Sequence, residues 1–340
     1  MATLCELLVP YPAISLIGMA KNTGKTTVLN HLIASFAERE TSLGITSLGL
    51  DGEAIDAETG TAKPRVFAPE GLIVATATGL LSSCEISKEI IATTGIPTAL
   101  GEVVVFRALS AGYVQIAGPS LRSQVSELSA IMSNLGVTKL LIDGALNRRA
   151  IACPQVSKAT VLCTGAALHR DLQRVISETA FAVKLLGTSE IDAEVAAQIA
   201  AIDDSDQGDY LIYRKRTPVA FTLGDAFEEP SELMAIYLQG ALTDATAAAL
   251  LSYSTKLPAL QLICDDSSKL FISEPIWQRL HRRDWELRVV NPINLVAVTI
   301  NPSSPKGFSF EPQLFLETMR ERIDLPVYDI VRGGGALVVS

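Results

Sequence analysis

The chain has 340 residues, of which 48% are hydrophobic and 19% are charged, and its formal net charge is −9. This composition can bury a sizeable core, which excludes a largely disordered chain. The acidic balance argues against nucleic-acid binding as the main activity, because that affinity rests on Lys and Arg contacts to phosphates. We therefore expect one large α/β domain or two ordinary ones, and no nucleic-acid partner.

The N-terminus and the cysteines indicate the compartment. Residues 1–10 carry Glu6 and no basic segment, so we expect no secretory signal. No apolar run reaches the roughly 18 residues that a membrane helix needs, which predicts no membrane partner. The cysteines are widely spaced and lack a zinc-binding pattern, so reduced thiols are the simple interpretation of Cys5, Cys84, Cys153, Cys163 and Cys264. These features together predict a cytoplasmic protein.

The first predicted elements form a βαβ unit. The apolar run 13–17 predicts a buried strand that ends at Gly18, and residues 26–39 carry apolar side chains at helical spacing. A second strand over 46–50 delivers Asp51 at its carboxyl end. Strand, glycine loop, helix and strand in this order imply a parallel sheet with a right-handed crossover.

Residues 60–119 predict a β-rich insertion on this core. Strands are expected at about 71–75, 101–106 and 113–117, and the short spacing between the last two predicts a hairpin. A helix over about 120–135 follows, and then a third core strand, 139–142, which ends at Asp143.

The rest of the chain continues to alternate strands with helices. A strand at about 159–164 and a helix at about 168–181 precede an acidic segment, 198–209, that is a plausible link. Beyond it, strands are predicted at 219–223, 259–264, 295–300 and 326–331, and helices at 243–254, 275–283 and 311–323. We therefore predict a first domain over 1–200, with the insertion at about 60–119, and a second α/β lobe over 201–340.

The segment Gly18-Met-Ala-Lys-Asn-Thr-Gly-Lys-Thr-Thr27 has the composition of a phosphate-binding P-loop. In such a loop, consecutive backbone N–H groups wrap a phosphate, and the following helix directs its positive end at the same anion. Five residues, instead of the usual four, separate the two glycines. The predicted nucleotide-binding residues are Gly18, Lys21, Asn22, Thr23, Gly24, Lys25, Thr26 and Thr27. The first domain is thus predicted to be a P-loop nucleotide-binding domain.

The chemistry of a P-loop gives several of these residues a role. We expect Lys25 to reach the β- and γ-phosphates as a catalytic residue, and Thr26 and Asp143 to hold Mg²⁺. Asp51 is the second catalytic candidate, because it would lie beside the γ-phosphate and could orient the attacking water or bind Mg²⁺ through water. An ordinary turn remains the alternative for both aspartates, and a solvated side chain is the alternative for Lys21. The expected cofactors are ATP and Mg²⁺, with ATP favoured over GTP because no Asn-Lys-x-Asp motif is present.

Other parts of the sequence give weaker signals. Arg148 and Arg149 follow the third core strand and could face phosphate, but two solvated arginines are the simpler interpretation. His169 has no acid or nucleophile near it in sequence, so we interpret it as structural. The segment Thr299-Ile300-Asn301-Pro302 ends a late strand, where contacts to the nucleotide base could be made.

Two resemblances accompany these motifs. The loop with five spacer residues followed by Lys-Thr resembles that of the dethiobiotin synthetase branch of P-loop proteins. Several segments taken together resemble the KamB subunit of the lysine 5,6-aminomutase reactivase over most of the chain. Besides the P-loop, they are Leu50-Asp-Gly-Glu53, Gln115-Ile-Ala-Gly-Pro-Ser120, Ile142-Asp-Gly-Ala-Leu-Asn-Arg148, Gly240-Ala-Leu-Thr-Asp244 and Val290-Asn-Pro-Ile293.

The second resemblance implies an ATPase that remodels a partner enzyme. Aminomutases that use adenosylcobalamin and pyridoxal phosphate inactivate when the cobalamin is damaged, and a reactivase uses ATP to let fresh cofactor in. The implied partners are a MutS-like reactivase subunit and a lysine 5,6-aminomutase. Assembly of this chain as a homodimer is a further alternative. The alternatives are an ATP-dependent small-molecule ligase or kinase of the dethiobiotin synthetase type, and a nucleotide-gated module for cofactor insertion.

Overall fold

The computed structural model divides the chain into two compact units, one over 1–180 with 294–340 and one over 181–293. The residues that it describes are 2–39, 41–49, 65–144, 156–202, 208–214, 216–223, 230–252 and 257–330. Several residues singled out above lie outside these ranges, namely Asp51, Glu53, Arg148, Arg149 and Cys153.

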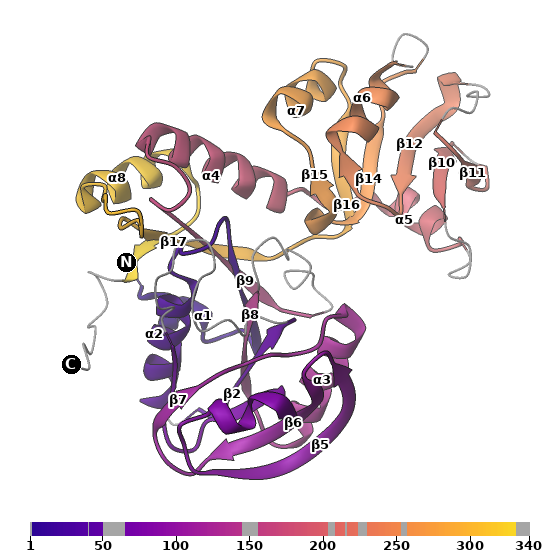
Figure 1. The fold of residues 1–340 in the computed structure, drawn as a ribbon. Coiled ribbons are helices and arrows are strands. Elements are labelled where there is room, and N and C mark those ends of the chain that lie inside the picture. The colour runs from indigo at the N-terminus through magenta and orange to yellow at the C-terminus, as the bar shows by residue number, and fades with distance from the viewer. Residues whose placement is uncertain are drawn as a thin grey trace. The chain divides into compact units, whose positions relative to one another are not determined.

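Unit 1 is built on a nine-stranded sheet with the order β18-β17-β9-β1-β8-β2-β4-β6-β5 (Figure 1). The strands from β18 to β4 run parallel, and β6 is antiparallel to both β4 and β5. Their bounds are β1 (Ala13–Gly18), β2 (Leu43–Leu48), β4 (Ile73–Ala77), β5 (Lys88–Thr98), β6 (Gly101–Ala108), β8 (Lys139–Gly144), β9 (Ala159–Gly165), β17 (Leu295–Asn301) and β18 (Val327–Asp329). A separate antiparallel pair is formed by β3 (Val66–Ala68) and β7 (Gly112–Val114).

Helices cover both faces of this sheet. On one face, α1 (Leu4–Leu8) and α2 (Lys25–Ala37) pack in one apolar cluster with Leu43 and Ile45 of β2. Gly44, between those two residues, faces α3 (Arg122–Asn134), because a Cβ at Gly44 would lie 2.7 Å from Met132. On β9, Thr164 hydrogen-bonds Thr179 of α4 (Leu172–Leu186) at 2.8 Å. A last helix, α8 (Pro312–Arg322), lies between β17 and β18 in the chain.

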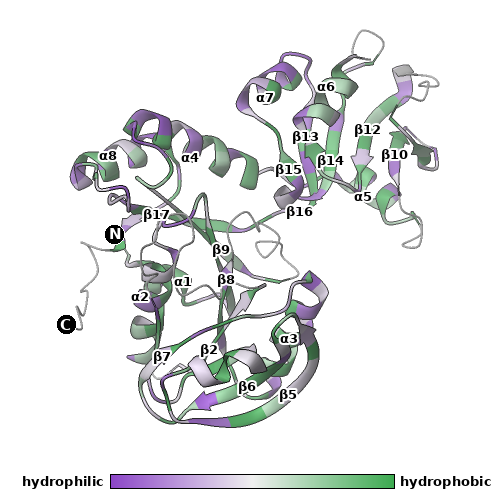
Figure 2. Ribbon diagram, viewed as in Figure 1, coloured by the Kyte–Doolittle hydropathy of each residue, from purple (hydrophilic) through white to green (hydrophobic). Residues whose placement is uncertain are grey.

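Unit 2 has its own five-stranded sheet, with the order β11-β10-β12-β14-β16. The strands β12, β14 and β16 run parallel, and β10 is antiparallel to both of its neighbours. The strands are β10 (Asp209–Tyr213), β11 (Val219–Phe221), β12 (Leu233–Leu238), β14 (Gln261–Asp266) and β16 (Glu286–Asn291), with a small pair, β13 (Leu242–Thr243) and β15 (Leu270–Phe271). The helices are α5 (Ala193–Ile199), α6 (Asp244–Ser252) and α7 (Glu274–His281). Figure 2 shows hydrophobic stretches on the strands of both sheets.

The observed division corrects the predicted boundary between residues 200 and 201. Residues 294–340 belong to unit 1, because β17 runs parallel to β9 and extends the first sheet. The β17 strand is buried on both faces over Leu295–Ile300, as a strand inside a parallel sheet must be. Its apolar run predicted the strand but not the sheet that it joins.

The predicted hairpin between 101–106 and 113–117 is also wrong. Strand β6 pairs with β5 and β4, whereas β7 pairs with β3. The sequence pattern missed β5 because most of its side chains are exposed or half-buried, so it lacks a regular apolar alternation. The observed pairings make β4, β6 and β5 an extension of the main sheet beyond β2.

Gly118 fixes the segment after β7 against the carboxyl end of β2. Its N–H donates to Ser47 Oγ at 3.0 Å, and a Cβ at Gly118 would lie 1.8 Å from the backbone oxygen of Ser47. We expect Gly118→Ala to lower the free energy of unfolding by about 3 kcal/mol, because the clash is with backbone. Urea unfolding measures this, with Gly240→Ala as the control, since a Cβ at Gly240 would meet nothing within 4 Å. Wild-type stability in the Gly118 variant would contradict this packing.

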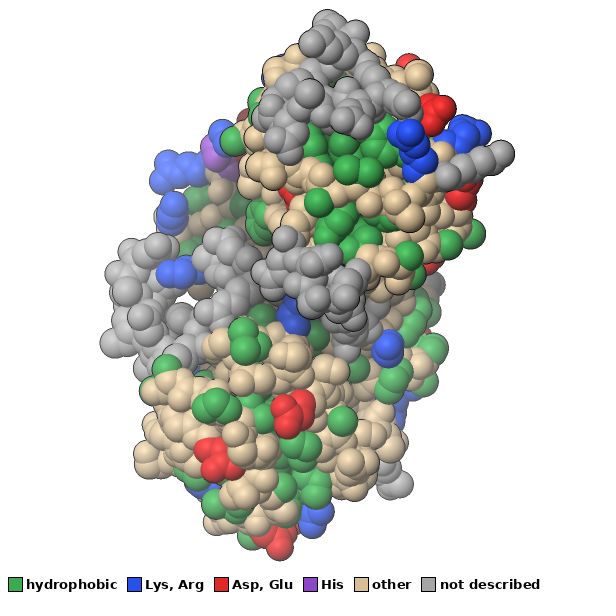
Figure 3. Space-filling view, turned by 90° about the vertical axis from the view of Figure 1, so that its right-hand side faces the viewer, with side chains coloured by type: hydrophobic (Ala, Val, Ile, Leu, Met, Phe, Trp, Pro, Cys, Tyr) green, Lys and Arg blue, Asp and Glu red, His purple; other side chains and the backbone are tan. Residues whose placement is uncertain are grey.

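The surface and the thiols complete the description. On the face drawn in Figure 3, Lys and Arg side chains and Asp and Glu side chains are both scattered among hydrophobic ones. Within the described ranges, no helix has the length and apolarity to cross a membrane, and no group of three or more His, Cys, Asp or Glu residues could hold a metal ion. Among the described residues, the cysteines Cys5, Cys84, Cys163 and Cys264 are free and buried.

Candidate functional site

The loop between β1 and α2 has the backbone of an anion-binding turn. Two residues in it have left-handed conformations, Asn22 with φ 61° and Gly24 with φ 88°. Left-handed residues between right-handed ones turn successive N–H groups toward one side and form a concave anion site. Gly24 is also the N-cap of the 13-residue helix α2 and supplies no side-chain cap, so the helix begins with its N–H groups directed at the loop.

The interior of the loop is closely packed. Thr23 is buried, and its hydroxyl donates to the carbonyl oxygen of Ala20 at 3.0 Å. A Cβ at Gly18 would lie 2.8 Å from Thr23 Oγ1 and 3.0 Å from Lys25 Cδ. Gly18 therefore gives the hydroxyl of Thr23 and the stem of Lys25 the room that they occupy.

Two strands on one side of β1 anchor the loop. The N–H of Met19 donates to the carbonyl oxygen of Cys163 on β9 at 3.0 Å. One strand further on, Asn301 at the end of β17 donates from Nδ2 to the carbonyl oxygen of Asn22 at 3.2 Å. The loop is thus attached to neighbouring strands at Met19 and at the left-handed residue Asn22.

Lys25 lies toward the other side of β1. Its Nζ donates to the carbonyl oxygen of Gly144, the last residue of β8. The preceding residue, Asp143, is buried at 7% exposure and lies opposite Leu16 of β1 in the parallel register. An ammonium group, a loop of N–H groups and a buried carboxylate therefore meet at the carboxyl edge of the sheet.

This edge is where ligands bind in open α/β sheets. In the strand order, β2 and β4, which follow β1 in the chain, lie on one side of β1. The later strands β9 and β17 lie on its other side. Such a reversal of direction leaves a crevice outside the carboxyl ends of the central strands. The loop after β1 lies at that reversal.

The thiol beneath the loop is neutral at ordinary pH. The pKa of Cys163 is raised to about 11, mainly by burial; the hydrogen bond with Thr299 and the charge of Lys25 oppose this shift, and Asp143 adds to it. The Cys163 thiol therefore contributes no charge next to the loop.

All eight predicted nucleotide-binding residues lie at the junction of β1 and α2. One loop and the first turn of α2 contain Gly18, Lys21, Asn22, Thr23, Gly24, Lys25, Thr26 and Thr27. Asp143 is the last residue but one of the neighbouring strand, β8. Asp51 lies outside the described residues. The strand that precedes it, β2, lies beside β8. Just after β2, the N–H of Gly49 donates to the carbonyl oxygen of Pro119 at 2.8 Å.

Two weaker candidates have local roles. His169 Nδ1 accepts a hydrogen bond from the Asp171 N–H at 2.9 Å, which fits the structural interpretation. The contact between Asn301 and the loop was missed, because the strand end at 299–302 predicted a base contact and not a bond to the backbone of the loop after β1.

The segments that carry the second resemblance also have structural roles in unit 2. Asp244 Oδ1 accepts the N–H of Ser273 at 2.7 Å and so fixes the residue before α7. Asn291 Nδ2 donates to the carbonyl oxygen of Asp265 at 3.4 Å at the end of β14. One residue of each of these two segments therefore has a structural contact within unit 2.

Comparisons of the chain with protein-family models, with curated proteins and with solved structures gave no match. The strands and helices themselves define the fold. The chain is an α/β protein with a large, mostly parallel central sheet. The resemblances to dethiobiotin synthetases and to the reactivase subunit therefore rest on the sequence segments quoted above.

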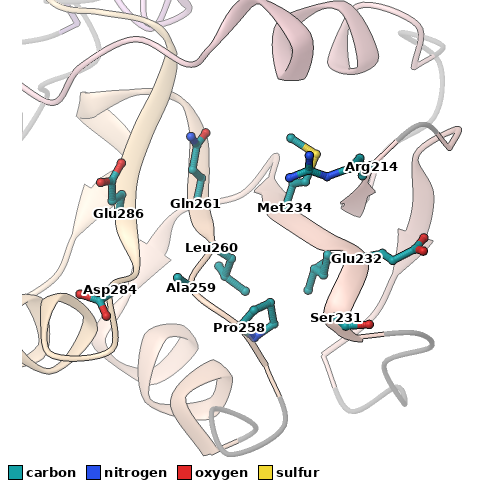
Figure 4. A pocket seen from close by; sticks show the side chains of 11 residues that line it. Arg214, Ser231, Glu232, Met234, Pro258, Ala259, Leu260, Gln261, Asp284 and Glu286 are labelled. Atoms are coloured by element: carbon teal, nitrogen blue, oxygen red, sulfur yellow. The ribbon is translucent and has the colours of Figure 1, made fainter.

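A pocket of about 360 Å³ lies in unit 2, at the amino edge of its parallel strands (Figure 4). Pro258 and Leu260 lie between Arg214 and Glu232 on one side and Gln261, Asp284 and Glu286 on the other. Two of these polar groups are engaged within the unit: Glu286 pairs with Arg288, and Gln261 donates to Asp192 at 2.8 Å. The pocket lies at the edge opposite to the carboxyl ends of β12, β14 and β16, and we give it no role in the proposed function.

Proposed function

We propose that this chain is a P-loop ATPase that binds Mg-ATP at the loop between β1 and α2. The observation that carries the proposal is the pair of left-handed residues, Asn22 and Gly24, around Thr23 at the start of α2. A backbone of this form exposes N–H groups to an anion, and the positive end of the helix adds to the attraction. The Lys25 ammonium supplies the full positive charge that a triphosphate requires.

The residues at this edge fit a magnesium ion by the chemistry of their donors. Mg²⁺ takes hard oxygen ligands and is usually bound by one or two carboxylates together with phosphate oxygens and water. Thr26 offers a hydroxyl in the first turn of α2, and Asp143 offers a buried carboxylate on the adjacent strand β8. These two residues would hold the ion, which would neutralise charge on the phosphates.

The contact between Lys25 and Gly144 supports a nucleotide-dependent switch. A Lys25 ammonium that turns toward a phosphate gives up its bond to the Gly144 carbonyl oxygen, at the point where β8 leads into residues 145–155. Phosphate-dependent contacts of this kind hold or release adjoining segments in switch proteins. We propose that this chain uses such a switch to remodel a partner enzyme in the cytoplasm.

The proposed client is a cobalamin-dependent lysine 5,6-aminomutase, acting with a MutS-like second subunit, and it follows from the sequence resemblance. The test combines the purified chain and second subunit with aminomutase inactivated by turnover. We expect ATP hydrolysis to be slow alone and several-fold faster with the client, and aminomutase activity to return on addition of adenosylcobalamin. Equal hydrolysis rates with and without the client would contradict the remodelling role.

Affinity capture from the native lysate with Mg-ATP complements this test. Recovery of an aminomutase or a MutS-like protein with the wild type, and not with Lys25→Ala, is the expected result. Phosphate release that depends strictly on a small metabolite would favour the alternative, a ligase or kinase of the dethiobiotin synthetase type, whose loop also has five spacer residues.

A further inference from the structure

We propose that Asn301 is a positioning residue that holds the P-loop in its anion-binding conformation, an inference that rests on the proposed function. Asn301 is the last residue of β17, two strands away from β1 in the sheet. Its Nδ2 donates to the carbonyl oxygen of Asn22 at 3.2 Å, and its backbone oxygen accepts the N–H of Ala166 at 2.9 Å. The Asn301 side chain thus connects β17 to the left-handed residue Asn22 of the loop.

The bond acts on the direction of one peptide group. In a trans peptide the C=O of one residue and the N–H of the next point in opposite directions. Because Asn301 holds the Asn22 carbonyl toward β17, the N–H of Thr23 points away from β17. Thr23 lies between the two left-handed residues, so its N–H is one of those that form the concave side of the loop.

The orientation of the Asn301 amide follows from its two partners. Oδ1 accepts the N–H of Ser303 at 3.1 Å, while Nδ2 donates to the Asn22 oxygen. The reversed amide would place Nδ2 against an N–H and Oδ1 against a carbonyl oxygen, so the hydrogen-bond network selects one orientation. An aspartate at position 301 keeps the shape but puts an oxygen against the Asn22 carbonyl.

The surroundings leave little room for Asn301 to move. A Cβ at Gly24 would lie 3.3 Å from Asn301 Cβ, and a Cβ at Gly165 would lie 2.3 Å from the Asn301 backbone oxygen. The two glycines allow β17 to come close to the loop on one side and to the end of β9 on the other. Asn301 therefore fixes the backbone of the P-loop relative to the end of β17.

The test compares Asn301→Asp, Asn301→Ala and a matched control, Asn294→Ala. Asn294 precedes β17 and also donates from Nδ2 to a backbone oxygen, that of Lys158 at 2.8 Å, but at the amino edge of the sheet. Titration calorimetry with Mg-ATP is expected to show affinity about tenfold weaker for the alanine variant, as for one lost hydrogen bond, and weaker still for the aspartate variant. The control should stay within about twofold of wild type.

A second readout separates positioning from stability. With ¹⁵N-threonine labelling, and Thr23 identified by Thr23→Ser, the Thr23 amide proton should move downfield on Mg-ATP binding in the wild type and in Asn294→Ala. That shift should be reduced in both Asn301 variants at temperatures where they are folded. Wild-type affinity and an unchanged Thr23 shift in both Asn301 variants would overturn the positioning role alone. Failure of the wild type to bind Mg-ATP would overturn the proposed function and this inference with it.

Discussion

Replacement of Lys25 by alanine is expected to weaken Mg-ATP binding by at least about 100-fold, because charge-assisted hydrogen bonds to the phosphates are lost. In the structure, Lys25 is half-buried, and its Nζ donates a hydrogen bond to the carbonyl oxygen of Gly144. Its removal should therefore change the melting temperature by only a few degrees. Titration calorimetry gives the affinity, and circular dichroism gives the melting temperature.

Lys158→Ala is the matched control for charge. Lys158 is an exposed lysine that precedes β9, at the amino edge of the same sheet. Its loss changes the net charge as much as the loss of Lys25, so the affinity for Mg-ATP should stay near that of the wild type. Equal affinity in wild type and Lys25→Ala would remove the P-loop assignment.

Replacement of Asp143 by asparagine is expected to reduce hydrolysis more than binding. The carboxylate is buried beside the strand that carries the P-loop, where it would hold the metal ion against the phosphates. We expect kcat to fall by about 100-fold, comparable to the loss of one electrostatic contact in a transition state, and the dependence on Mg²⁺ to shift to higher concentrations. Steady-state phosphate release over a Mg²⁺ series measures both.

Asp51→Asn provides the comparison for this experiment. If Asp51 orients the attacking water, its variant should lose kcat while keeping the Mg²⁺ dependence of the wild type. If Asp143→Asn turns over at the wild-type rate, a different acid serves the metal, and Asp51 becomes the first candidate.

The strand–loop–helix unit β1–α2 could be predicted from sequence because its signals are local. The apolar run of β1, the glycines and the helical spacing of α2 lie within 25 residues of one another. The carboxyl end of β8 was also predicted, since a parallel strand buried on both faces has a continuous apolar run that Asp143 and Gly144 interrupt.

The sheet order and the strand partners could not be predicted, because they depend on contacts between distant segments. The apolar run of β17 does not indicate that it pairs with β9 rather than with a strand of unit 2. The strands β10, β12 and β16 and the short helices α1 and α5 were missed as well. The bond from Asn301 to Asn22 joins residues 279 positions apart, and no local pattern indicates it.

Hydrogen–deuterium exchange with and without Mg-ATP tests the central claim most directly. The site lies in peptides that cover Gly18–Val28, the P-loop and the first turn of α2, and in the peptide that ends at Gly144. The account predicts that Mg-ATP slows exchange in these peptides and leaves the pocket residues of unit 2 unchanged. Unchanged exchange over Gly18–Val28 at saturating Mg-ATP would contradict it.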